Sequence, residues 1–309
     1  MNTKLSINNI VDWTTTEDMV NNVKVDEVGV LDRVSSLATR SIKKESKLNA
    51  LQKIVSMCDL TTLEGEDTEG KIIQMSSKAI APDPNDESVP SAAAVCVYPA
   101  LVSTAKKTVK DSSVKVASVS SYFPSGQAPI ESKISDTKFA FNEGADEIDL
   151  VINRKAFFEG DYKKVYEEIK SLKDVCGDIH LKTILEIGEL KTYENIKKAS
   201  VIALCAGSDF IKTSTGKISN GSSREACLVM ARTVREFQSY GYGMRGIKVA
   251  GGIRSSKDAI RYLVIINEEL GSSWLSPDYF RFGASSLLDA VSYTHLRAHE
   301  TKANIVCRL

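Results

Sequence analysis

Two lysines of this chain lie in strings that predict buried strands, at positions whose side chains would point into the interior. A buried lysine amine can attack a carbonyl carbon. The first is Lys212, in the string FIKTSTGK, whose aromatic and β-branched start is typical of a buried strand. Because strand side chains alternate between two faces, Lys212 shares a face with Phe210 and Ser214. An ammonium group on the inner face of a buried strand lowers the stability of the fold, so such a lysine is expected where function requires it. The alternative is a lysine on an edge strand that extends its amine into solvent.

The second lysine is Lys248, in the string GIKVAGG, which we expect on the neighbouring strand. Two ammonium groups in one dry cavity repel each other, so one of them loses its proton near neutral pH. A neutral lysine amine is the nucleophile that forms a Schiff base with a carbonyl. We therefore expect Lys212 and Lys248 to point into one cavity and to act together.

Acidic and basic side chains on other expected strands complete this group. Asp149, in EIDLVIN, is an inward carboxylate that could relay protons through a water, or could only balance the lysines as a salt bridge. Lys182 and Glu186 would share a face of HLKTILEIG, and Lys182 is either a third participant or part of the charge balance. Asp59 lies on the first expected strand.

Glycines and hydroxyl residues gather at the ends of the last three expected strands. Backbone amides that glycine leaves open, together with serine hydroxyls, make a cradle for an anion. A single pair of glycines is weak evidence, because glycines also serve tight turns, but three groups on consecutive strands indicate a phosphate site. The three groups are Gly216-Lys217, Gly251-Gly252 and Gly283-Ala284-Ser285-Ser286.

Short apolar strings alternate with longer amphipathic segments along the chain, which predicts strand–helix units and a parallel sheet. Eight units in this length indicate a closed (β/α)₈ barrel of the TIM type, a single domain of the α/β class. A doubly wound open sheet is the alternative, but its glycine-rich fingerprint is missing after the first strand. We interpret the Pro- and Asp-rich segment 81–92 as a long excursion on the βα side. The expected strands are residues 56–63, 92–99, 114–121, 147–153, 180–188, 210–216, 246–252 and 279–285.

The composition of the 309 residues is that of a globular protein, 42% hydrophobic and 26% charged, with a formal net charge of zero. Zero net charge argues against nucleic acid or a membrane surface as a partner. The N-terminal residues lack the apolar segment of a signal peptide, and the six cysteines form no CxxC pair, so we expect reduced thiols and a cytoplasmic location. With three histidines, His180, His295 and His299, a histidine-ligated metal site is disfavoured, and we expect no metal and no cofactor.

Seven strings between about residues 55 and 288 together resemble the 2-deoxyribose-5-phosphate aldolase family, in its longer eukaryotic-type form. They are CDLTTL, AAVCVYP, GADEIDLVIN, LKTILEIGEL, AGSDFIKTSTGK, KVAGGIRS and FRFGASSLL. The resemblance implies a (β/α)₈ barrel and a lysine-dependent, class I aldolase. Such an enzyme reversibly cleaves 2-deoxy-D-ribose 5-phosphate to glyceraldehyde 3-phosphate and acetaldehyde in deoxyribonucleoside catabolism. Small sugar phosphates and aldehydes would be its partners, and the chain could form a homo-oligomer.

By the same resemblance, Lys212 corresponds to the Schiff-base lysine, and Lys248 and Asp149 to its catalytic companions. Supporting roles are expected for Lys182, Asp59 and Thr215. Val249 stands where the family often has proline, and strand alternation turns it away from the lumen. The phosphate-binding positions correspond to Gly216, Lys217, Gly251, Gly252, Gly283, Ser285 and Ser286.

We expect three parts in the chain: a helical N-terminal extension over residues 1–45, the aldolase barrel over 46–290, and a non-native tail over 291–309. The tail from Val291 to Thr301 resembles the in-frame translation of a transposase-type sequencing adapter, and Val306 to Leu309 fits the stretch beyond its barcode, so we interpret it as non-native. The alternative is a divergent final helix. His295, His299 and Cys307 belong to this tail.

Two other functions compete with the class I aldolase. A barrel that binds a sugar phosphate without catalysis would have no reason to direct two amines and a carboxylate into one cavity. A metal-dependent aldolase is disfavoured by the scarcity of histidines.

Overall fold

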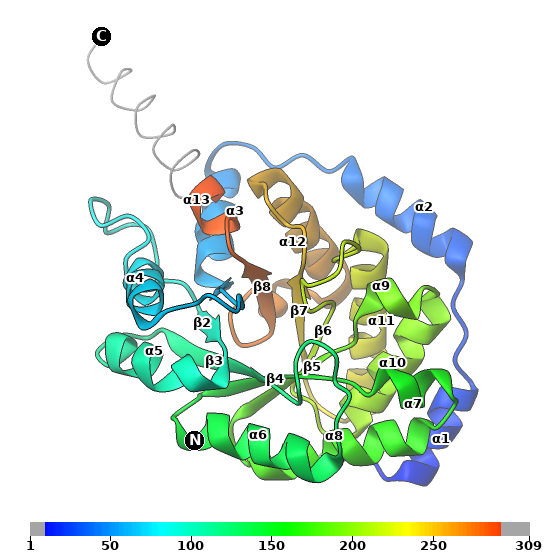
Figure 1. Ribbon diagram of the computed structural model, residues 1–309. Helices are drawn as coiled ribbons and strands as arrows, with labels where there is room; N and C mark the ends of the chain where they lie inside the picture. The colour runs from blue at the N-terminus through cyan, green and yellow to red at the C-terminus, as the bar shows by residue number, and fades with distance from the viewer. Residues whose placement is uncertain (1–9, 292–309) are drawn as a thin grey trace, which may run out of the picture.

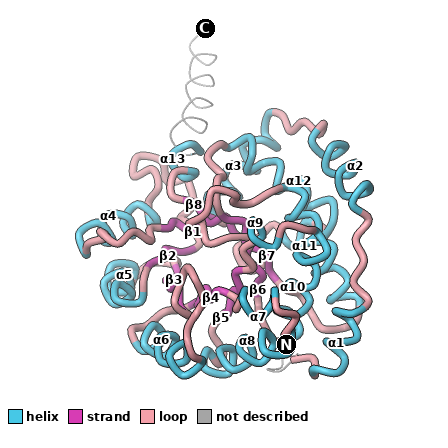
Figure 2. The backbone as a smooth tube through the Cα atoms, turned by 45° about the vertical axis from the view of Figure 1, so that its right-hand side comes forward, coloured by secondary structure: helices cyan, strands magenta, loops and turns pink. Residues whose placement is uncertain are grey.

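Eight parallel strands close into a barrel in the order in which they occur along the chain. The computed structural model describes residues 10–291. Seen along the barrel, the strands form a central ring with helices around it (Figure 2). The predicted (β/α)₈ barrel is therefore confirmed, and the doubly wound sheet is excluded. The strands are β1 (Cys58–Thr61), β2 (Ala94–Val97), β3 (Lys115–Ser120), β4 (Glu147–Val151), β5 (His180–Ile184), β6 (Phe210–Lys212), β7 (Gly246–Ala250) and β8 (Phe280–Ala284).

Amphipathic helices connect the strands and cover the outside of the barrel (Figure 1). Several begin at a side chain that caps the first turn: Asp161 accepts from the Lys164 amide, and Ser223 accepts from the Ala226 amide. The helices are α1 (Trp13–Asn21), α2 (Glu27–Ala38), α3 (Lys44–Ser56), α4 (Glu69–Ile80), α5 (Val102–Val109), α6 (Ile130–Asn142), α7 (Arg154–Phe158), α8 (Tyr162–Cys176), α9 (Ile187–Leu190), α10 (Tyr193–Cys205), α11 (Arg224–Ser239), α12 (Ser256–Leu270) and α13 (Leu287–Val291), with 3₁₀ turns η1 (Pro99–Leu101) and η2 (Ser272–Trp274).

Alternation along the strands separates an apolar layer from a charged lumen. On β7, Ile247 and Val249 belong to the hydrophobic core between strands and helices, whereas Lys248, between them, forms ion pairs with acidic side chains of other strands. Val249 therefore points away from the lumen, as predicted. Gly246, at the start of β7, leaves room for Phe210, because a Cβ there would lie 2.3 Å from the ring.

From residue 10 onward, the N-terminal segment before the barrel is mainly helical, as predicted, and packs on the outer helices. Helix α1 contacts α8 and α10, and α2 contacts α11 and α12. The Tyr166 hydroxyl donates a hydrogen bond to the Val11 carbonyl at 2.6 Å, and the Arg33 Nε lies 2.9 Å from an Glu269 carboxylate oxygen. These contacts attach the extension to the barrel wall. The boundary near residue 45 stays a prediction.

Two other predictions about chain segments have different outcomes. Segment 81–92 connects the end of α4 to β2, so it lies on the αβ side of the barrel, and the prediction of a βα-side excursion was wrong. The proposed tail begins at Val291, the last residue of α13, and its remainder, 292–309, lies outside the described residues. Over residues 10–291, none of the helices has the length and apolar character needed to cross a membrane.

Candidate active site

Three lysines converge on one buried carboxylate inside the barrel. Both Lys212 and Lys248 place their Nζ atoms against the same oxygen of Asp149, Oδ2, at 2.7 and 2.8 Å. Lys182, paired with Asp149 in the strand register, contacts the other oxygen, Oδ1, at 2.9 Å. Lys212 and Lys248 face each other in the register of β6 and β7. The structure thus brings the predicted pair of amines together beside the predicted acid.

Burial and neighbouring charges shift the pKa values of these groups in different directions. Burial alone would raise the pKa of Asp149, but the three lysine ammonium groups, Lys182 foremost, hold that pKa well below its usual range. Burial likewise opposes a charge on Lys248, but Asp149 and Asp59 outweigh it and raise the pKa of Lys248 well above its usual value. For Lys212 the balance is reversed. Burial lowers the pKa, the repulsion of Lys248 adds to the lowering, and the attraction of Asp149 does not cancel them.

A cavity of about 640 Å³ opens above this cluster, at the carboxyl ends of β1, β6, β7 and β8. Lys212 lines it, whereas Asp149 and Lys248 are not among its lining residues and are fully buried. Of the three predicted catalytic side chains, Lys212 is therefore the one that a molecule in the cavity would meet first. Asp149 and Lys248 contact it from within the barrel.

All seven predicted phosphate positions line this cavity: Gly216, Lys217, Gly251, Gly252, Gly283, Ser285 and Ser286. Gly216 and Gly252 have φ angles of 81° and 84°, a left-handed conformation that glycine adopts without strain. The Lys217 ammonium lies 2.9 Å from an oxygen of Glu64, on the loop after β1. Three further cations that the sequence reasoning did not single out also line the cavity: Lys71, Lys78 and Arg254.

The three predicted supporting residues contact the cluster or its rim. Lys182 lies between Asp149 and Glu147, and its pKa is raised because these two carboxylates outweigh the effect of burial. This arrangement favours the interpretation of Lys182 as part of the charge balance. Asp59 lies 2.6 Å from the Lys248 amine. Thr215 lines the cavity, and its hydroxyl accepts from the Lys217 amide at 3.0 Å.

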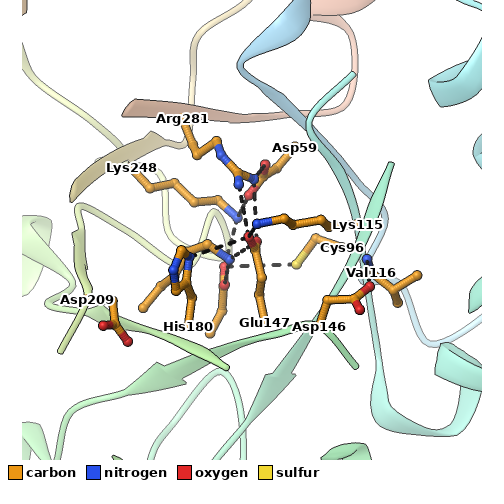
Figure 3. A network of polar contacts seen from close by, with 12 residues as sticks. Asp59, Cys96, Lys115, Val116, Asp146, Glu147, His180, Asp209, Lys248 and Arg281 are labelled. Atoms are coloured by element: carbon orange, nitrogen blue, oxygen red, sulfur yellow. Dashed lines mark hydrogen bonds and ion pairs between the residues drawn. The ribbon is translucent and has the colours of Figure 1, made fainter. Parts of the chain in front are cut away.

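Two charged side chains of this buried cluster were missed by sequence reasoning. Glu147 begins β4, two residues before Asp149 and therefore on the same face, and Arg281 lies on β8 (Figure 3). The period of two along EIDLV could have identified Glu147. Arginine between two phenylalanines in FRFGA gives no such signal, because arginine is usually exposed.

Glu186 lies elsewhere than expected. Strand β5 ends at Ile184, and Glu186 takes a left-handed backbone conformation with φ of 59°, so it does not share a strand face with Lys182. Its buried carboxylate instead accepts hydrogen bonds from the amide and the hydroxyl of Thr215. The expected face was wrong because the strand ends before this residue.

The remaining predicted features concern histidine, metal and thiols. His180 packs against the Phe210 ring at 5.9 Å, and burial lowers its pKa. Within the part of the chain that the structure describes, no group of histidine, cysteine and acidic side chains is arranged to hold a metal ion. Cys58, Cys96, Cys176, Cys205 and Cys227 are free and buried, and Cys307, His295 and His299 lie outside the described residues.

Sequence and structure comparisons agree with one another. Residues 53–292 match the family described as DeoC/LacD family aldolase. The chain is 42% identical over 284 residues to the deoxyribose-phosphate aldolase of Homo sapiens, covering 88% of this chain and 89% of that protein, and equally similar to that of Mus musculus. The crystal structure of a presumed deoxyribose-phosphate aldolase from Coccidioides immitis superposes with a TM-score of 0.68 at 25% identity, covering 88% of this chain and 99% of that one.

Proposed function

The chain belongs to the DeoC/LacD family of aldolases, and from that premise we propose that it reversibly cleaves 2-deoxy-D-ribose 5-phosphate to glyceraldehyde 3-phosphate and acetaldehyde through a Schiff base on Lys212. Identity of 42% with curated deoxyribose-phosphate aldolases over most of the chain supports this substrate. The single observation that carries the role of Lys212 is its position, since its side chain lines the cavity while burial lowers its pKa.

The proposed reaction begins when the neutral Lys212 amine attacks the aldehyde carbon of the open-chain sugar; one proton is taken up and water leaves, which gives a protonated Schiff base. That cation accepts the electron pair of the bond between C2 and C3 as the bond breaks. The proton of the C3 hydroxyl passes to a base, and glyceraldehyde 3-phosphate departs. The enamine left on Lys212 gains a proton at C2, and hydrolysis then releases acetaldehyde.

Asp149 is the acid–base group that we assign to the proton at the carbon that becomes the acetaldehyde methyl. Its Oδ2 contacts the Lys212 amine at 2.7 Å, so it lies beside the atom at which the Schiff base forms. A water between this carboxylate and the substrate carbon would carry the proton across the remaining gap. Lys248 contacts the same oxygen, and its positive charge disfavours a second positive charge on free Lys212.

The phosphate of the substrate is proposed to bind at the far side of the cavity, against the glycine and serine positions after β6, β7 and β8. Open backbone amides and hydroxyl groups donate hydrogen bonds to anions there. Lys217 adds a positive charge, with a side chain only partly exposed. We place the reaction in deoxyribonucleoside catabolism in the cytoplasm, and the buried free thiols fit a reducing compartment. Assembly into a homo-oligomer stays a prediction.

Covalent trapping tests the proposal. Acetaldehyde and borohydride should convert the Schiff base into an ethyl group on one lysine, and peptide mapping should place that group on Lys212. A protein that binds the sugar phosphate without catalysis would bind the phosphorylated sugar but would neither cleave it nor be trapped. An ethyl group on a different lysine would overturn the assignment of Lys212.

A further inference from the structure

The lumen of the barrel contains a closed ring of alternating charges, to which Lys212 is attached from outside. Each member of the ring contacts one oppositely charged side chain on either side, and the ring closes on itself. In order around the ring, the members are Asp149, Lys248, Asp59, Arg281, Glu147 and Lys182.

The lower half of this ring lies away from the cavity. Arg281 bridges two carboxylates, with nitrogen–oxygen distances of 2.6 Å to Asp59 and 2.9 Å to Glu147. Asp59 continues to Lys248 at 2.6 Å, and Glu147 to Lys182 at 2.5 Å. The labelled members Arg281, Asp59, Glu147 and Lys248 converge on one network in Figure 3. Neither Arg281 nor Glu147 lines the cavity, and both are buried, so neither would contact the substrate.

The ring is electrically balanced, because it holds three carboxylates and three cations. Lys212 is a fourth basic group, and its amine contacts an oxygen of Asp149 that Lys248 already occupies. Charges buried this deeply are stable only when they are compensated. A proton on Lys212 would therefore leave one uncompensated positive charge in the lumen. This accounts for Lys212 as the amine that is free to react, while Lys182 and Lys248 remain charged.

Other polar groups around the ring are weaker influences. Lys115 and His180 approach Glu147 from the amino-terminal end of the barrel at 3.5 and 3.8 Å, and the Lys115 side chain is 40% exposed, so solvent screens its charge. Cys96, on β2, places its sulfur 4.0 Å from Asp149 Oδ2, and burial raises the pKa of this thiol, which keeps it uncharged.

We propose that Arg281 and Glu147 are positioning residues that set how readily Lys212 gives up its proton, although neither touches Lys212 or the cavity. The inference rests on the proposed function, in which Lys212 reacts as a neutral amine. Its physical basis is the charge balance of the ring: removing a cation leaves the ring negative and retains the proton on Lys212. Removing an anion leaves the ring positive and expels that proton.

Opposite shifts of the pH profile in variants of Arg281 and of Glu147 distinguish this proposal from a purely structural role. In Arg281→Met, the rise of kcat/KM with pH, which reports the free enzyme, should move to higher pH by about one unit. In Glu147→Gln, which keeps the shape of the side chain, the rise should move to lower pH. The double variant restores neutrality and should return to the wild-type profile. Arg281→Lys keeps the charge and serves as the matched control.

A second readout measures the Lys212 proton without turnover. The rate of reductive methylation by formaldehyde and a mild borane, followed on the Lys212 peptide by mass spectrometry, reports the neutral amine at each pH. In each variant, the pH dependence of this methylation rate should shift in the same direction as the profile of kcat/KM against pH. Shifts of the same sign in both single variants, or a double variant that stays displaced, would overturn the proposal. If Arg281→Met does not fold, Glu147→Gln decides alone, because an unshifted methylation profile would contradict the charge balance.

The trapping experiment separates the two levels of inference. If the wild type is trapped at Lys212 but the variants share its pH profiles, the proposed function stands and the proposed role of the ring is wrong. If the wild type is trapped at another residue, the proposed function is wrong, and the methylation rate of Lys212 still tests the proposed role of the ring.

Discussion

Lys212 and Lys248 share a single oxygen atom of Asp149, yet their pKa values move in opposite directions from the ordinary lysine value. The second contact of Lys248 explains the difference, because an oxygen of Asp59 also lies 2.6 Å from its amine. Lys212 has no ion-pair partner of its own beyond the shared oxygen in the described part of the chain. One carboxylate therefore holds a charged and a reactive amine side by side.

Replacing Lys212 with alanine should abolish covalent trapping and lower kcat by about 10³-fold or more, on the scale on which removing a nucleophile acts. The measurement is borohydride trapping with acetaldehyde together with steady-state cleavage of 2-deoxyribose 5-phosphate. Lys212→Met is a control that keeps an unbranched, uncharged side chain of similar length but not a nucleophile, and it should be equally inactive. A reducible adduct that forms at the wild-type rate in Lys212→Ala would contradict the assignment.

Lys248→Leu should depress activity most at neutral pH. Without this cation, the remaining carboxylates favour a proton on Lys212, so the pKa of Lys212 rises and the neutral amine becomes scarce. Activity should recover partly as pH is raised, and a profile of kcat/KM against pH measures this. The variant should also lose about 3–5 kcal/mol of stability, since Asp59 and Asp149 each lose a buried partner. Equal loss of activity at every pH would argue against proton control by Lys248.

The part of this site that the sequence could predict is the part that the alternation of side chains along each strand determines. Alternation alone placed Lys212, Lys248, Lys182 and Asp149 on inward faces, because it needs only the local pattern of each strand. The contact of Arg281 with Glu147 joins β8 to β4 across the lumen, and only closure of the barrel brings those strands together. No spacing along the chain encodes that distance.

The same limit explains the errors at segment ends. Segment 81–92 was placed on the wrong side because its proline and aspartate residues mark a loop without saying which element comes before it. Glu186 was placed on a strand because the apolar pattern continues to it. The backbone instead turns at this residue into a left-handed conformation that no local propensity predicts for glutamate.

Ser286→Asp should raise KM for 2-deoxyribose 5-phosphate by about tenfold or more, because a carboxylate would repel the phosphate where a hydroxyl donates to it. The effect on kcat for the unphosphorylated sugar should be small. Ser286→Ala, which removes the hydroxyl without adding charge, is the matched control and should raise KM less. An unchanged preference for the phosphorylated sugar in Ser286→Asp would show that the phosphate binds elsewhere.

Gly283→Ala should disturb Lys248 through packing alone. A Cβ at this position on β8 would lie 2.9 Å from the Cβ of Ala250 and 3.1 Å from the Cε of Lys248. Overpacking of this kind costs about 1–3 kcal/mol, and we expect a matching loss in thermal stability together with lower activity. Gly70→Ala in α4, where an added Cβ would be in ordinary contact with the Thr68 hydroxyl at 4.0 Å, is the control and should lower neither. Wild-type activity in Gly283→Ala would show that Lys248 tolerates displacement.

The last prediction concerns Glu186, which links three loops at the mouth of the barrel. Its carboxylate accepts from the Thr215 amide at 3.3 Å and lies 3.5 Å from a nitrogen of Arg154. Arg154 in turn donates to the carbonyls of Pro124 and Ser125 at 3.1 and 2.9 Å. Thr215 precedes the phosphate positions Gly216 and Lys217. Glu186 should therefore hold the phosphate loop in place without touching the reacting carbon.

Glu186→Gln keeps an acceptor for Thr215 but loses the charge that Arg154 contacts. We expect KM for the phosphorylated substrate to rise about three- to tenfold, the scale of one lost hydrogen bond of roughly 1 kcal/mol. The yield of Lys212 trapped with acetaldehyde, which has no phosphate, should not change. Arg154→Lys is the companion variant, since it keeps the charge but loses the two carbonyl contacts. A fall in trapping equal to the rise in KM would place Glu186 in the chemistry instead.

The pH dependence of stability tests the same carboxyl independently of activity. Burial, more than any other influence, raises the pKa of Glu186 above its ordinary value, so the folded chain binds this proton more tightly than the unfolded chain does. Stability contributed by the protonated group is complete below the unfolded pKa, about 4.3 for glutamate, and is lost as pH rises through the folded pKa. Glutamine has no proton to lose. The melting temperature of the wild type relative to Glu186→Gln should therefore fall as pH rises from about 4 toward 7. A difference that stays constant over that range would mean that folding does not shift this pKa, and one that grows would mean that folding favours the charged form of Glu186, held by Thr215 and Arg154.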